Sequence, residues 1–581
     1  MADTPLKEAW SSRLGVILAV AGSAVGLGNF LRFPGLAAQY GGGAFMIAYF
    51  ISLLLIGIPI GWAEWTMGRR GGIAGFHSSP GIFYSIVKHR FGKYLGIFGF
   101  IVPVMVYMYY VYIEAWCLGY ALNAATGTFS QPGINFGDFF NRFTGAGADG
   151  ASIHFGLQDV GLFVIIVYAL NFFFIYRGIN KGVEFVCKWG MPILIAIAII
   201  ILARVLTLGT PDAAKPDQSV MNGLGFMWNP AKPVVERLVD GNWRTVEILV
   251  NDAVAATRVT TLATDGSERI ATPSMLKNLR NPQLWLAAAG QIFFSLSVGF
   301  GAIITYASYL RKKDDVVLSG LTAASANEFC EVGLGGLITV PAAFVFLGAA
   351  GVAGQGTFAL GFNVLPYVFS QMPAADFFAT IFYLLLFLAA VTSSLSMLQP
   401  GIAFFQEGFG LTRKPAMAIL GLITAIGTAL VWWFSKDLKA LDTIDFWIGT
   451  VFIFLGGAAL IIVFSWVIGV DEGIREAHQG AEMKIPKIYR PIMKYVTPAY
   501  LCIIFTMFLL ANIFGWNFEF GSSAQFNPTS YVTDLVGPNP NASARLTFGF
   551  IVTTIFFVLM LINQAGKRWD AEGRKNGGNQ S

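Results

Sequence analysis

Long apolar segments constrain the fold of this chain more than any other feature of its sequence. Each is about 20 residues or longer, the length at which a helix crosses the hydrocarbon core of a bilayer. Only 12% of all residues are charged, against about a quarter in an average soluble domain. The expected segments are 13–37, 43–69, 92–124, 160–176, 184–207, 284–311, 318–349, 375–406, 413–434, 445–470, 492–514 and 545–566. The sequence therefore predicts an all-α integral membrane protein with twelve transmembrane helices.

The first apolar segment contains residues that a lipid-facing helix tolerates poorly. Its stretch Gly22–Pro34 includes several glycines, Asn29 and Arg32. A break in the helix here would free backbone N–H and C=O groups, which persist in a membrane only where they line a cavity. The alternative is that the glycines allow two helices to approach closely, as small residues often do in membranes.

A second interrupted segment lies at the corresponding place in the other half of the chain. The stretch Phe294–Ala302 repeats the Val-Gly-(Leu/Phe)-Gly pattern of Val25–Gly28. Two glycine-interrupted membrane segments in corresponding positions are typical of a transporter with a central binding site. The repeat therefore favours two broken helices around a site over simple close packing.

Basic residues collect in alternate loops between the apolar segments. By the positive-inside rule this pattern places both termini in the cytoplasm. We expect a multi-pass protein of the inner (plasma) membrane with no cleavable signal peptide. The net charge of +5 indicates no nucleic-acid partner, because the basic residues belong to these loops. The cysteines and histidines show no metal-ligand spacing.

Residues 208–283 form the longest polar interruption and are expected on the extracellular or periplasmic side. Within this insert, Trp243–Val250 and Arg258–Ile270 alternate between apolar and polar residues, which predicts a small β-hairpin. A surface elaboration is the favoured interpretation, and a functional lid is the alternative.

Several motifs resemble the neurotransmitter:sodium symporters, and most closely their bacterial amino-acid branch. They are Trp10–Gly15, Gly26–Pro34, Gly41–Phe45, Tyr109–Tyr110, Ile303–Tyr309, Thr392–Ser394 and Asp445–Trp447. The resemblance implies the LeuT-like fold: a 5+5 inverted repeat with broken helices 1 and 6, and two extra C-terminal helices. The implied limits are 1–12 for a cytoplasmic N-terminal segment, 13–207 for the first repeat, 208–283 for the insert, 284–470 for the second repeat, 471–566 for helices 11 and 12, and 567–581 for a cytoplasmic tail. The oligomeric state is left open, a homodimer included.

The resemblance also implies an amino-acid substrate held between the two breaks. The implied substrate-binding residues are Ala24, Gly26, Gly28, Val106, Tyr110, Phe294, Ser295, Ser297, Phe300, Ser396 and Met397. Freed N–H groups at a half-helix N-terminus suit a carboxylate. Family members that carry biogenic amines have an Asp at the position of Gly26, so an amino acid that brings its own carboxylate is favoured. Ser23 departs from the Asn usual in this branch.

Two co-transported Na⁺ ions follow from the same resemblance, and Na⁺ is a hard cation that takes oxygen ligands. The first site would use Ala24, Asn29, Ser295 and Asn327. The second would use Gly22, Val25, Ala389, Thr392 and Ser393. The alternative for Thr392–Ser394 is that the hydroxyls bond back to their own helix.

The resemblance assigns the remaining polar residues to an acid and to two gates. Glu331 would replace the chloride ion of chloride-dependent members, with Tyr49, Gln291, Ser295 and Asn327 around it. Arg32 and Asp445 would form the outer gate, with Phe300 and Tyr110 as the lid below it. Lys7, Trp10, Tyr309 and Glu407 would form the inner gate, where Lys7 and Glu407 replace an Arg–Asp pair.

Together these observations predict a sodium-coupled symporter of apolar or neutral amino acids, such as leucine, alanine or methionine. It would work by alternating access and without chloride. The alternatives are a non-transporting amino-acid sensor on the same fold, or a symporter of another carboxylate-bearing amine. An enzyme is not expected, because the four histidines are scattered and no catalytic cluster is evident.

Overall fold

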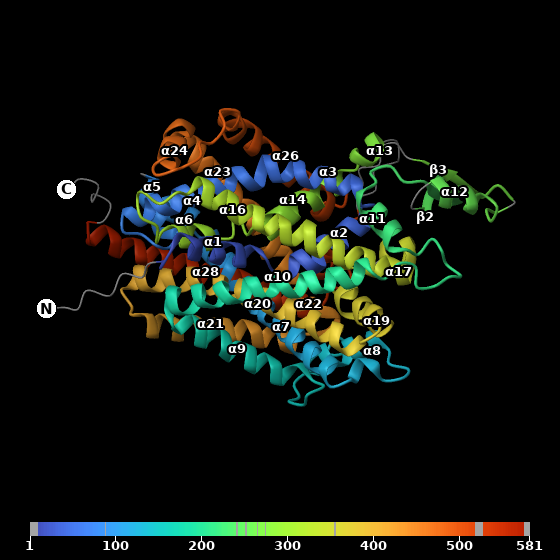
Figure 1. Cartoon of the computed structure of the whole chain (residues 1–581). Coiled ribbons are helices and arrows are strands. Elements are labelled where there is room, and N and C mark those ends of the chain that lie inside the picture. Colours follow the sequence, from blue (N-terminus) through green and yellow to red (C-terminus); the bar gives the residue numbers. More distant parts are fainter. Residues whose placement is uncertain are drawn as a thin grey trace.

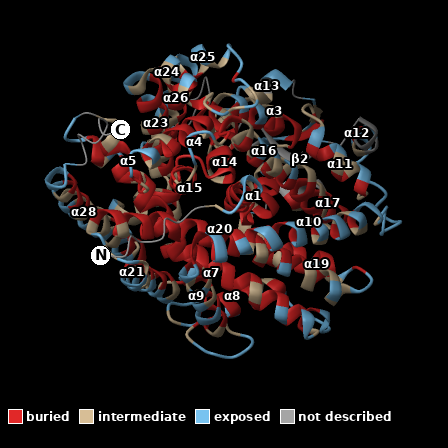
Figure 2. Cartoon of the chain, turned by 60° about the vertical axis from the view of Figure 1, so that its left-hand side comes forward, coloured by how far each residue is buried: buried red, intermediate tan, exposed pale blue. Residues whose placement is uncertain are grey.

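The structure is a computed structural model that describes residues 10–87, 89–239, 242–249, 252–263, 265–272, 275–353, 356–516 and 527–573. Its long helices lie roughly side by side along one axis (Figure 1). The short helices α5, α6 and α24 lie at one end of this bundle, and α11 to α13 with the strands lie at the other. Buried residues fill the centre of the bundle and exposed residues cover its rim (Figure 2).

The first half of the chain, up to the insert, is almost entirely helical. Its elements are α1 (Arg13–Ala24), the π-helical turn η1 (Gly28–Arg32), α2 (Phe33–Gln39), α3 (Gly43–Ser52), η2 (Leu53–Gly57), α4 (Ile58–Ile73), α5 (Ser79–Ile86), α6 (Gly92–Leu95), α7 (Phe98–Ala125), η3 (Thr128–Ser130), α8 (Phe136–Thr144), α9 (Val160–Tyr176), η4 (Ile179–Glu184) and α10 (Phe185–Leu206). Ser12 caps α1, because its side chain accepts from the Gly15 N–H.

The second half begins after the insert with another interrupted helix. Its elements are α14 (Pro282–Leu296), α15 (Ala302–Ala307), α16 (Val317–Glu328), η5 (Phe329–Gly336), α17 (Leu337–Ala353), α18 (Thr357–Ala359), η6 (Leu360–Val364), α19 (Leu365–Ser370), α20 (Ala375–Phe409), α21 (Arg413–Trp433), η7 (Lys436–Leu438), α22 (Lys439–Phe446), η8 (Trp447–Phe452), α23 (Ile453–Ile462), η9 (Val463–Gly469) and α24 (Val470–Ala477). The C-terminal elements are α25 (Tyr489–Pro491), η10 (Ile492–Val496), α26 (Thr497–Phe508), η11 (Leu509–Ile513), α27 (Ser530–Val536) and α28 (Ala542–Ala571).

The number of membrane spans is smaller by strict criteria than the sequence predicts. Within the described residues, nine continuous helices are long and apolar enough to cross a bilayer, and the bent pair Arg13–Ala24 and Gly28–Gln39 makes ten. Of the remaining predicted spans, 160–176 is matched by a shorter apolar helix, Val160–Tyr176, and 284–311 is interrupted between α14 and α15. Twelve spans and the inverted repeat therefore stay predictions.

Both predicted interruptions are present as helix ends. Helix α1 ends at Ala24, where the extended Val25 follows, and the two parts of this span are bent by 48°. Helix α14 ends at Leu296, and Ser297, Gly299 and Gly301 all have positive φ. A Cβ at Gly301 would overlap the backbone of Gly99, so only glycine fits this close approach. These two ends free the backbone groups that form the site.

The insert folds differently from its predicted hairpin. Its elements are α11 (Val220–Trp228), β1 (Val234–Val239), β2 (Asn242–Ile248), α12 (Asp252–Val259), β3 (Glu268–Ala271) and α13 (Met275–Leu279). The strands form an antiparallel sheet in the order β2-β1-β3. The hairpin is therefore β1–β2, and most of the predicted strand 258–270 is not a strand. Strand β3 pairs with β1 instead, where Arg237–Glu268 and Arg269–Glu236 are ion pairs.

A buried lysine attaches the insert to the turn between the first two spans. The Lys232 ammonium group donates to the carbonyl oxygens of Gly41 and Asn229 and lies 4.4 Å from the centre of the Phe226 ring. A Cβ at Gly42 would overlap the Phe226 carbonyl oxygen. The insert therefore packs directly on the turn at Gly41 and Gly42, between the first two spans.

Candidate functional site

A small chamber lies where the two broken helices face one another. Its volume is about 20 Å³, and a single water molecule needs about 10–15 Å³ measured in this way. The lining residues are Ser23, Ala24, Gly26, Gly28, Asn29, Tyr110, Phe294, Ser295, Ser297, Phe300, Ser393 and Met397. Backbone from both breaks and side chains from α7 and α20 therefore enclose one space, lined by apolar as well as hydroxyl and amide groups, with no charged side chain among these residues.

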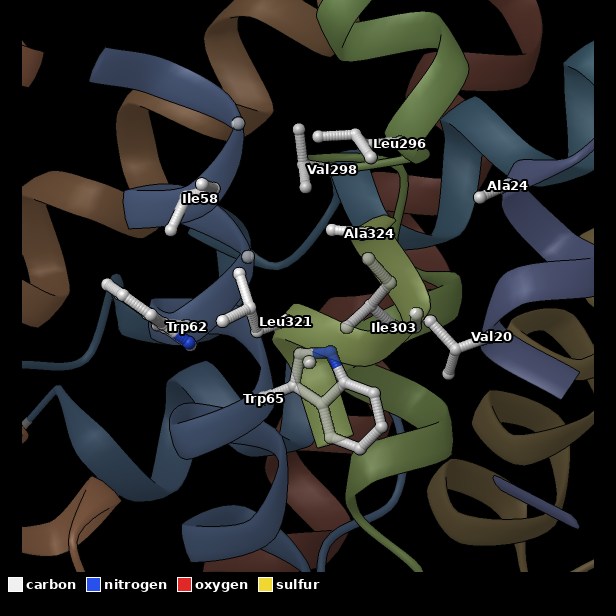
Figure 3. Close-up of a pocket in the computed structure, with 14 residues that line it drawn as sticks. Val20, Ala24, Ile58, Trp62, Trp65, Leu296, Val298, Ile303, Leu321 and Ala324 are labelled. Carbon is white, nitrogen blue, oxygen red and sulfur yellow. The ribbon is translucent and has the colours of Figure 1, made fainter. Parts of the chain in front are cut away.

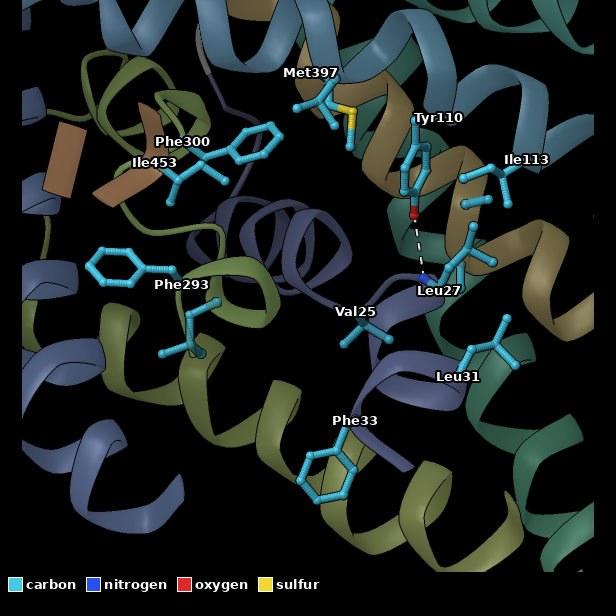
Figure 4. Packing of buried hydrophobic residues seen from close by; sticks show 14 of the residues in the cluster. Val25, Leu27, Leu31, Phe33, Tyr110, Ile113, Phe293, Phe300, Met397 and Ile453 are labelled. Carbon is cyan, nitrogen blue, oxygen red and sulfur yellow. Dashed lines mark hydrogen bonds between the residues drawn. The ribbon is translucent and has the colours of Figure 1, made fainter. Parts of the chain in front are cut away.

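Tyr110 of α7 meets the exposed backbone of the first break. Its hydroxyl oxygen accepts from the Leu27 N–H at 3.3 Å, as Figure 4 shows. The neighbouring Gly26 N–H donates to Asn29 Oδ1 at 2.8 Å. A Cβ at Gly26 would come to 2.9 Å from both the Tyr110 hydroxyl and the Ser393 hydroxyl. Glycine at this position therefore lets three elements converge, and a larger acidic side chain has no room.

The structure places the implied substrate residues unevenly. All of them line the chamber except Val106 and Ser396. Val106 is fully buried in α7. The Ser396 hydroxyl is engaged elsewhere, because it donates to the Thr392 carbonyl oxygen at 3.0 Å and accepts from the Tyr306 hydroxyl at 2.9 Å. Ser23 and Ser393 line the chamber although neither was expected among the substrate residues.

The side chains implied for the first sodium site form a connected hydrogen-bond chain. Asn29 Nδ2 donates to Asn327 Oδ1 at 2.8 Å, and Asn327 Nδ2 donates to the Ser295 hydroxyl at 2.7 Å. All three side chains are fully or nearly fully buried. With Ala24 in the same chamber wall, this arrangement gathers amide and hydroxyl oxygens from α14, α16 and the first break.

The residues implied for the second sodium site also come together. The Ser393 hydroxyl lies 3.3 Å from the Gly22 carbonyl oxygen and 3.5 Å from that of Val25. The Thr392 hydroxyl donates to the Ala389 carbonyl oxygen at 3.0 Å. Thr392 thus bonds back to its own helix, whereas Ser393 reaches across to α1. The back-bonding alternative therefore describes Thr392, and the sodium-site assignment of this hydroxyl cluster stays a prediction.

Glu331 lies at the end of the hydrogen-bond chain formed by Asn29, Asn327 and Ser295. It is fully buried, and its Oε1 accepts from Gln291 Nε2 at 2.7 Å. Its Oε2 accepts from Asn29 Nδ2 at 3.2 Å, from Asn327 Nδ2 at 3.3 Å and from the Ser295 hydroxyl. The fourth expected neighbour, Tyr49, donates its hydroxyl hydrogen to Glu328 at 2.9 Å. The acid is therefore surrounded by neutral donors.

A larger cavity of about 100 Å³ lies on the outer side of the chamber. Arg32 and Asp445 both line it, but these two described residues form no direct ion pair. The Arg32 guanidinium stacks 4.7 Å from the centre of the Phe294 ring, and the Asp445 carboxylate accepts from the Tyr109 hydroxyl at 2.5 Å. Phe294 lines both cavities, whereas Phe300 lines only the chamber. Phe294 rather than the expected Phe300 therefore separates them together with Tyr110.

At the end of the molecule that is expected to face the cytoplasm, here called the inner end, described residues are joined by direct hydrogen bonds. Trp10 Nε1 donates to the Tyr306 carbonyl oxygen at 3.1 Å, and Tyr309 stacks on His77 with ring centres 4.6 Å apart. The Glu407 carboxylate accepts from the Ser78 N–H at 2.9 Å, from the Ser78 hydroxyl at 2.8 Å and from the His77 N–H. Lys7, its expected partner, lies outside the described residues.

A third cavity, of about 30 Å³, lies behind the breaks and differs in chemistry. Figure 3 shows Trp62 and Trp65 beside Leu296, Leu321 and other apolar side chains that face this space. The Trp62 N–H already donates to the Val317 carbonyl oxygen at 3.1 Å. The cavity therefore lacks the converging polar groups that distinguish the chamber.

Buried acids inside helices are the functional candidates that the sequence argument did not single out. Glu114 accepts from Asn171 Nδ2 at 3.0 Å, and Glu184 accepts from the Ser11 N–H at 3.0 Å. Both carboxylates are buried. An ionisable residue within an apolar segment was a signal that could have found them.

Comparison with known proteins identifies the family. The model of the sodium:neurotransmitter symporter family matches residues 7–134 and 258–564. The chain belongs to this family. It is therefore a sodium-dependent transporter and a multi-pass membrane protein, and members of the family are transporters rather than enzymes. The unmatched stretch, residues 135–257, contains most of the insert.

Individual relatives match nearly along their whole length. A sodium-dependent transporter of Haemophilus influenzae is 27% identical over 523 residues, which cover 87% of this chain and 98% of the relative. A sodium-dependent transporter of Methanocaldococcus jannaschii is 28% identical over 509 residues, which cover 86% of this chain and 89% of the relative. The crystal structure of MhsT in complex with L-phenylalanine matches with a TM-score of 0.68 at 27% identity, over 86% of this chain and 99% of MhsT.

Proposed function

We propose that this transporter carries neutral amino acids together with Na⁺ by alternating access through the chamber between the two breaks. The observation that carries the proposal is the composition of the chamber, whose lining has backbone ends, hydroxyls and amides but no charged side chain. A substrate with a net charge would be left without a counter-ion in a buried space, which is costly. A zwitterion brings both charges itself and can place them against backbone dipoles.

The two ends of an amino acid have suitable partners. The N–H groups of Gly26 to Gly28 and the Tyr110 hydroxyl would hold the carboxylate, because a half-helix N-terminus favours an anion. Carbonyl oxygens of Ala24, Phe294 and Ser297 would accept from the ammonium group. In the structure the Leu27 N–H donates to the Tyr110 hydroxyl, so the substrate would replace that bond. Substrate entry also requires the chamber to expand.

The side-chain preference follows from the apolar part of the chamber wall. Phe294, Phe300 and Met397 line it, and a thioether side chain adapts to ligands of different shape. MhsT, a relative of this chain, was crystallised with L-phenylalanine. We expect apolar neutral side chains to bind better than small polar or charged ones.

Two Na⁺ ions are proposed to accompany each substrate. Asn29, Ser295, Asn327 and the Ala24 carbonyl would hold one, and the substrate carboxylate would complete its shell. Ser393, Thr392 and the carbonyls of Gly22, Val25 and Ala389 would hold the other. The convergence of these oxygens from both halves of the chain supports the assignment, since ion binding would then require both halves to close.

Chloride independence is proposed because a carboxylate already lies beside the first ion site. Replacing Glu331 by Ser would remove that negative charge and leave Gln291, Asn327 and Ser295 as donors facing an empty position. Uptake by Glu331→Ser is expected to require chloride. Uptake by the parent protein is expected to proceed without it. A variant whose uptake ignores chloride would contradict the role of Glu331.

The main test is uptake into proteoliposomes with an inward sodium gradient. Accumulation of labelled leucine with sodium, inhibited by phenylalanine and methionine but not by glutamate or lysine, would support the proposal. A monoamine without a carboxylate should not compete. Binding without accumulation would favour a sensor and would overturn the transport mechanism. Reagents of known sidedness would also test the proposed inner-membrane orientation with both termini in the cytoplasm.

A further inference from the structure

The N-terminal end of helix α1 is attached to α10 through a buried carboxylate. The Glu184 side chain accepts from the Ser11 N–H at 3.0 Å and from the Ser11 hydroxyl. Glu184 is only 4% exposed, and it lies at the junction between the π-helical turn η4 and α10. Glu184, at the start of the fifth predicted span, therefore binds Ser11, which immediately precedes the N-cap residue Ser12 of the first span.

The first turn of α1 is shaped to receive this carboxylate. A Cβ at Gly15 would overlap the Glu184 side chain. Glycine destabilises a helix relative to alanine by about 0.5–1 kcal/mol, so its presence here has a cost that the close contact explains. The N-terminus of a helix also presents unpaired N–H groups and the positive end of its dipole, which stabilise an anion.

The same pair of helices meets again about two turns further along α1, at the proposed second sodium site. A Cβ at Gly22 would lie 3.0 Å from Cys187 Sγ and 3.3 Å from Thr392 Cβ. Cys187 lies on α10 three residues after Glu184, and Gly22 supplies one of the carbonyl oxygens around Ser393. Movement of the inner half of α1 away from α10 would therefore separate Ser11 from Glu184 and also remove the Gly22 carbonyl from Ser393.

We propose that Glu184 is a positioning residue of the inner gate, which holds the inner half of α1 against α10 and so keeps the second sodium site assembled. This inference rests on the proposed function. The attachment of Arg13 in the same segment differs from it, because the Arg13 side chain that pairs with Asp315 and Glu482 is 41% exposed. Water competes with such an exposed ion pair, whereas the Glu184 carboxylate is itself buried, although its partner Ser11 is exposed.

Cys187 is a native reporter of this contact. It is fully buried, and it should become reachable from the cytoplasm when α1 leaves α10. The parent for the test keeps Cys187 and carries Cys117→Ala, Cys330→Ala and Cys502→Ala. Its rate of reaction with a membrane-impermeant thiol reagent is measured in nanodiscs, with sodium or with potassium in its place, and the half-saturating sodium concentration is taken from the sodium dependence of that rate.

The variants attack the contact from both sides. Glu184→Ala removes the carboxylate, and Gly15→Ala leaves Glu184 intact but fills its place. Both are expected to raise the labelling rate in sodium about tenfold and to raise the half-saturating sodium concentration. Glu184→Gln keeps the shape and an acceptor oxygen. Its labelling rate should therefore lie between the rate of the parent and the rates of Glu184→Ala and Gly15→Ala. Glu472→Gln removes an exposed carboxylate from the same end of the molecule, where it pairs with Arg475, and should match the parent.

The outcomes separate the inference from the function on which it rests. Labelling of Glu184→Ala and Gly15→Ala within twofold of the parent, with the sodium response unchanged, would overturn the role of Glu184 and leave sodium-coupled transport standing. Faster labelling in both variants, with no effect of sodium on the parent, would support the gate contact but contradict the proposed coupling. A variant that does not fold is recognised by its elution profile, and Glu184→Gln and Gly15→Ala then decide the question.

Discussion

The two ends of the path through the molecule are closed in different ways. At the inner end, buried groups from distant parts of the chain bond directly, as Glu407 does with the backbone before α5. At the outer end, Arg32 and Asp445 face the same cavity of about 100 Å³ without touching each other. Direct buried contacts are expensive to break, whereas charges separated by space can be bridged by water. The difference indicates a molecule that is shut toward one side and close to opening toward the other.

The largest effect should come from breaking the inner end at Glu407. Glu407→Ala would leave the Ser78 hydroxyl and two backbone N–H groups without their acceptor, and each buried unpaired group costs about 1–3 kcal/mol. We expect sodium-driven uptake to fall by about 30-fold or more, with faster labelling of Cys187 from the inner side. Glu407→Gln retains an acceptor oxygen and should lose much less. Equal uptake by Glu407→Ala and the parent would contradict the contrast between the two ends.

The outer pair should be less sensitive. Asp445→Asn keeps an acceptor for the Tyr109 hydroxyl but removes the attraction across the cavity to Arg32. Because those charges are separated, we expect the apparent affinity for substrate to fall by about five- to tenfold, or about 1–1.4 kcal/mol. Concentration curves for uptake measure this effect, and Asp442→Asn in the same helix provides a control. A loss as large as that of Glu407→Ala would mean that the two ends are equally dependent on their charges.

The aromatic lid should have a smaller effect that identifies the residue responsible. Phe294→Leu removes the ring beneath the Arg32 guanidinium, and such a contact contributes about 0.5–2 kcal/mol. The rate of substrate release to the outer side should rise by about two- to fivefold. Phe300→Leu should not change that rate, because Phe300 does not line the outer cavity. A change only in the Phe300 variant would restore the original lid assignment.

The last prediction concerns the docking of the insert at the outer end. Burial lowers the pKa of Lys232 from 10.5 to about 7, and its recorded partners are two carbonyl oxygens and a ring. Once released into water, the amine regains its ordinary pKa. Between about pH 7 and 10 the docked form then binds fewer protons than the released form, so docking strengthens as pH rises. Below pH 7 the Lys232 amine is protonated in both the docked and the released form, so docking no longer changes with pH.

Limited proteolysis of the insert measures this dependence. The parent protein should be cut more slowly at pH 9 than at pH 7, whereas Lys232→Met should be cut at one rate at both values after correction for protease activity. Arg258→Met, elsewhere in the insert, should keep the pH dependence of the parent. Slower cutting of the parent at pH 7 than at pH 9 would reverse the sign and contradict the buried amine.

Local chemistry explains which parts of the fold were predictable. Glycine and asparagine in an apolar segment are unfavourable unless the helix breaks, so the interruptions near Gly26 and Gly299 followed from the sequence. The hairpin did not, because alternation marks a strand without naming its partner. The pairing of Glu236 with Arg269, which places β3 beside β1, depends on a contact across 33 residues.

The residues of the candidate site also differ in how far the sequence could predict them. Oxygen-bearing residues such as Asn29, Asn327 and Ser393 were implied by the resemblance to the family and not by a local pattern of the sequence. The direction of a side chain around a broken helix was not predictable, because it depends on backbone angles such as the positive φ of Ser297, Gly299 and Gly301. The contact of Glu184 with Ser11 joins residues 173 positions apart, and no local pattern reveals it.

The absence of charged side chains in the chamber lining also determines how the transport cycle responds to voltage. If neither the protein's binding chamber nor the zwitterion contributes net charge, every co-transported Na⁺ carries an uncompensated positive charge inward. Each such charge gains about 2.3 kcal/mol per 100 mV of membrane potential, which corresponds to about 50-fold more substrate accumulation. The cycle is therefore expected to be electrogenic, and an energised membrane would drive uptake even where the sodium concentrations on its two sides are equal.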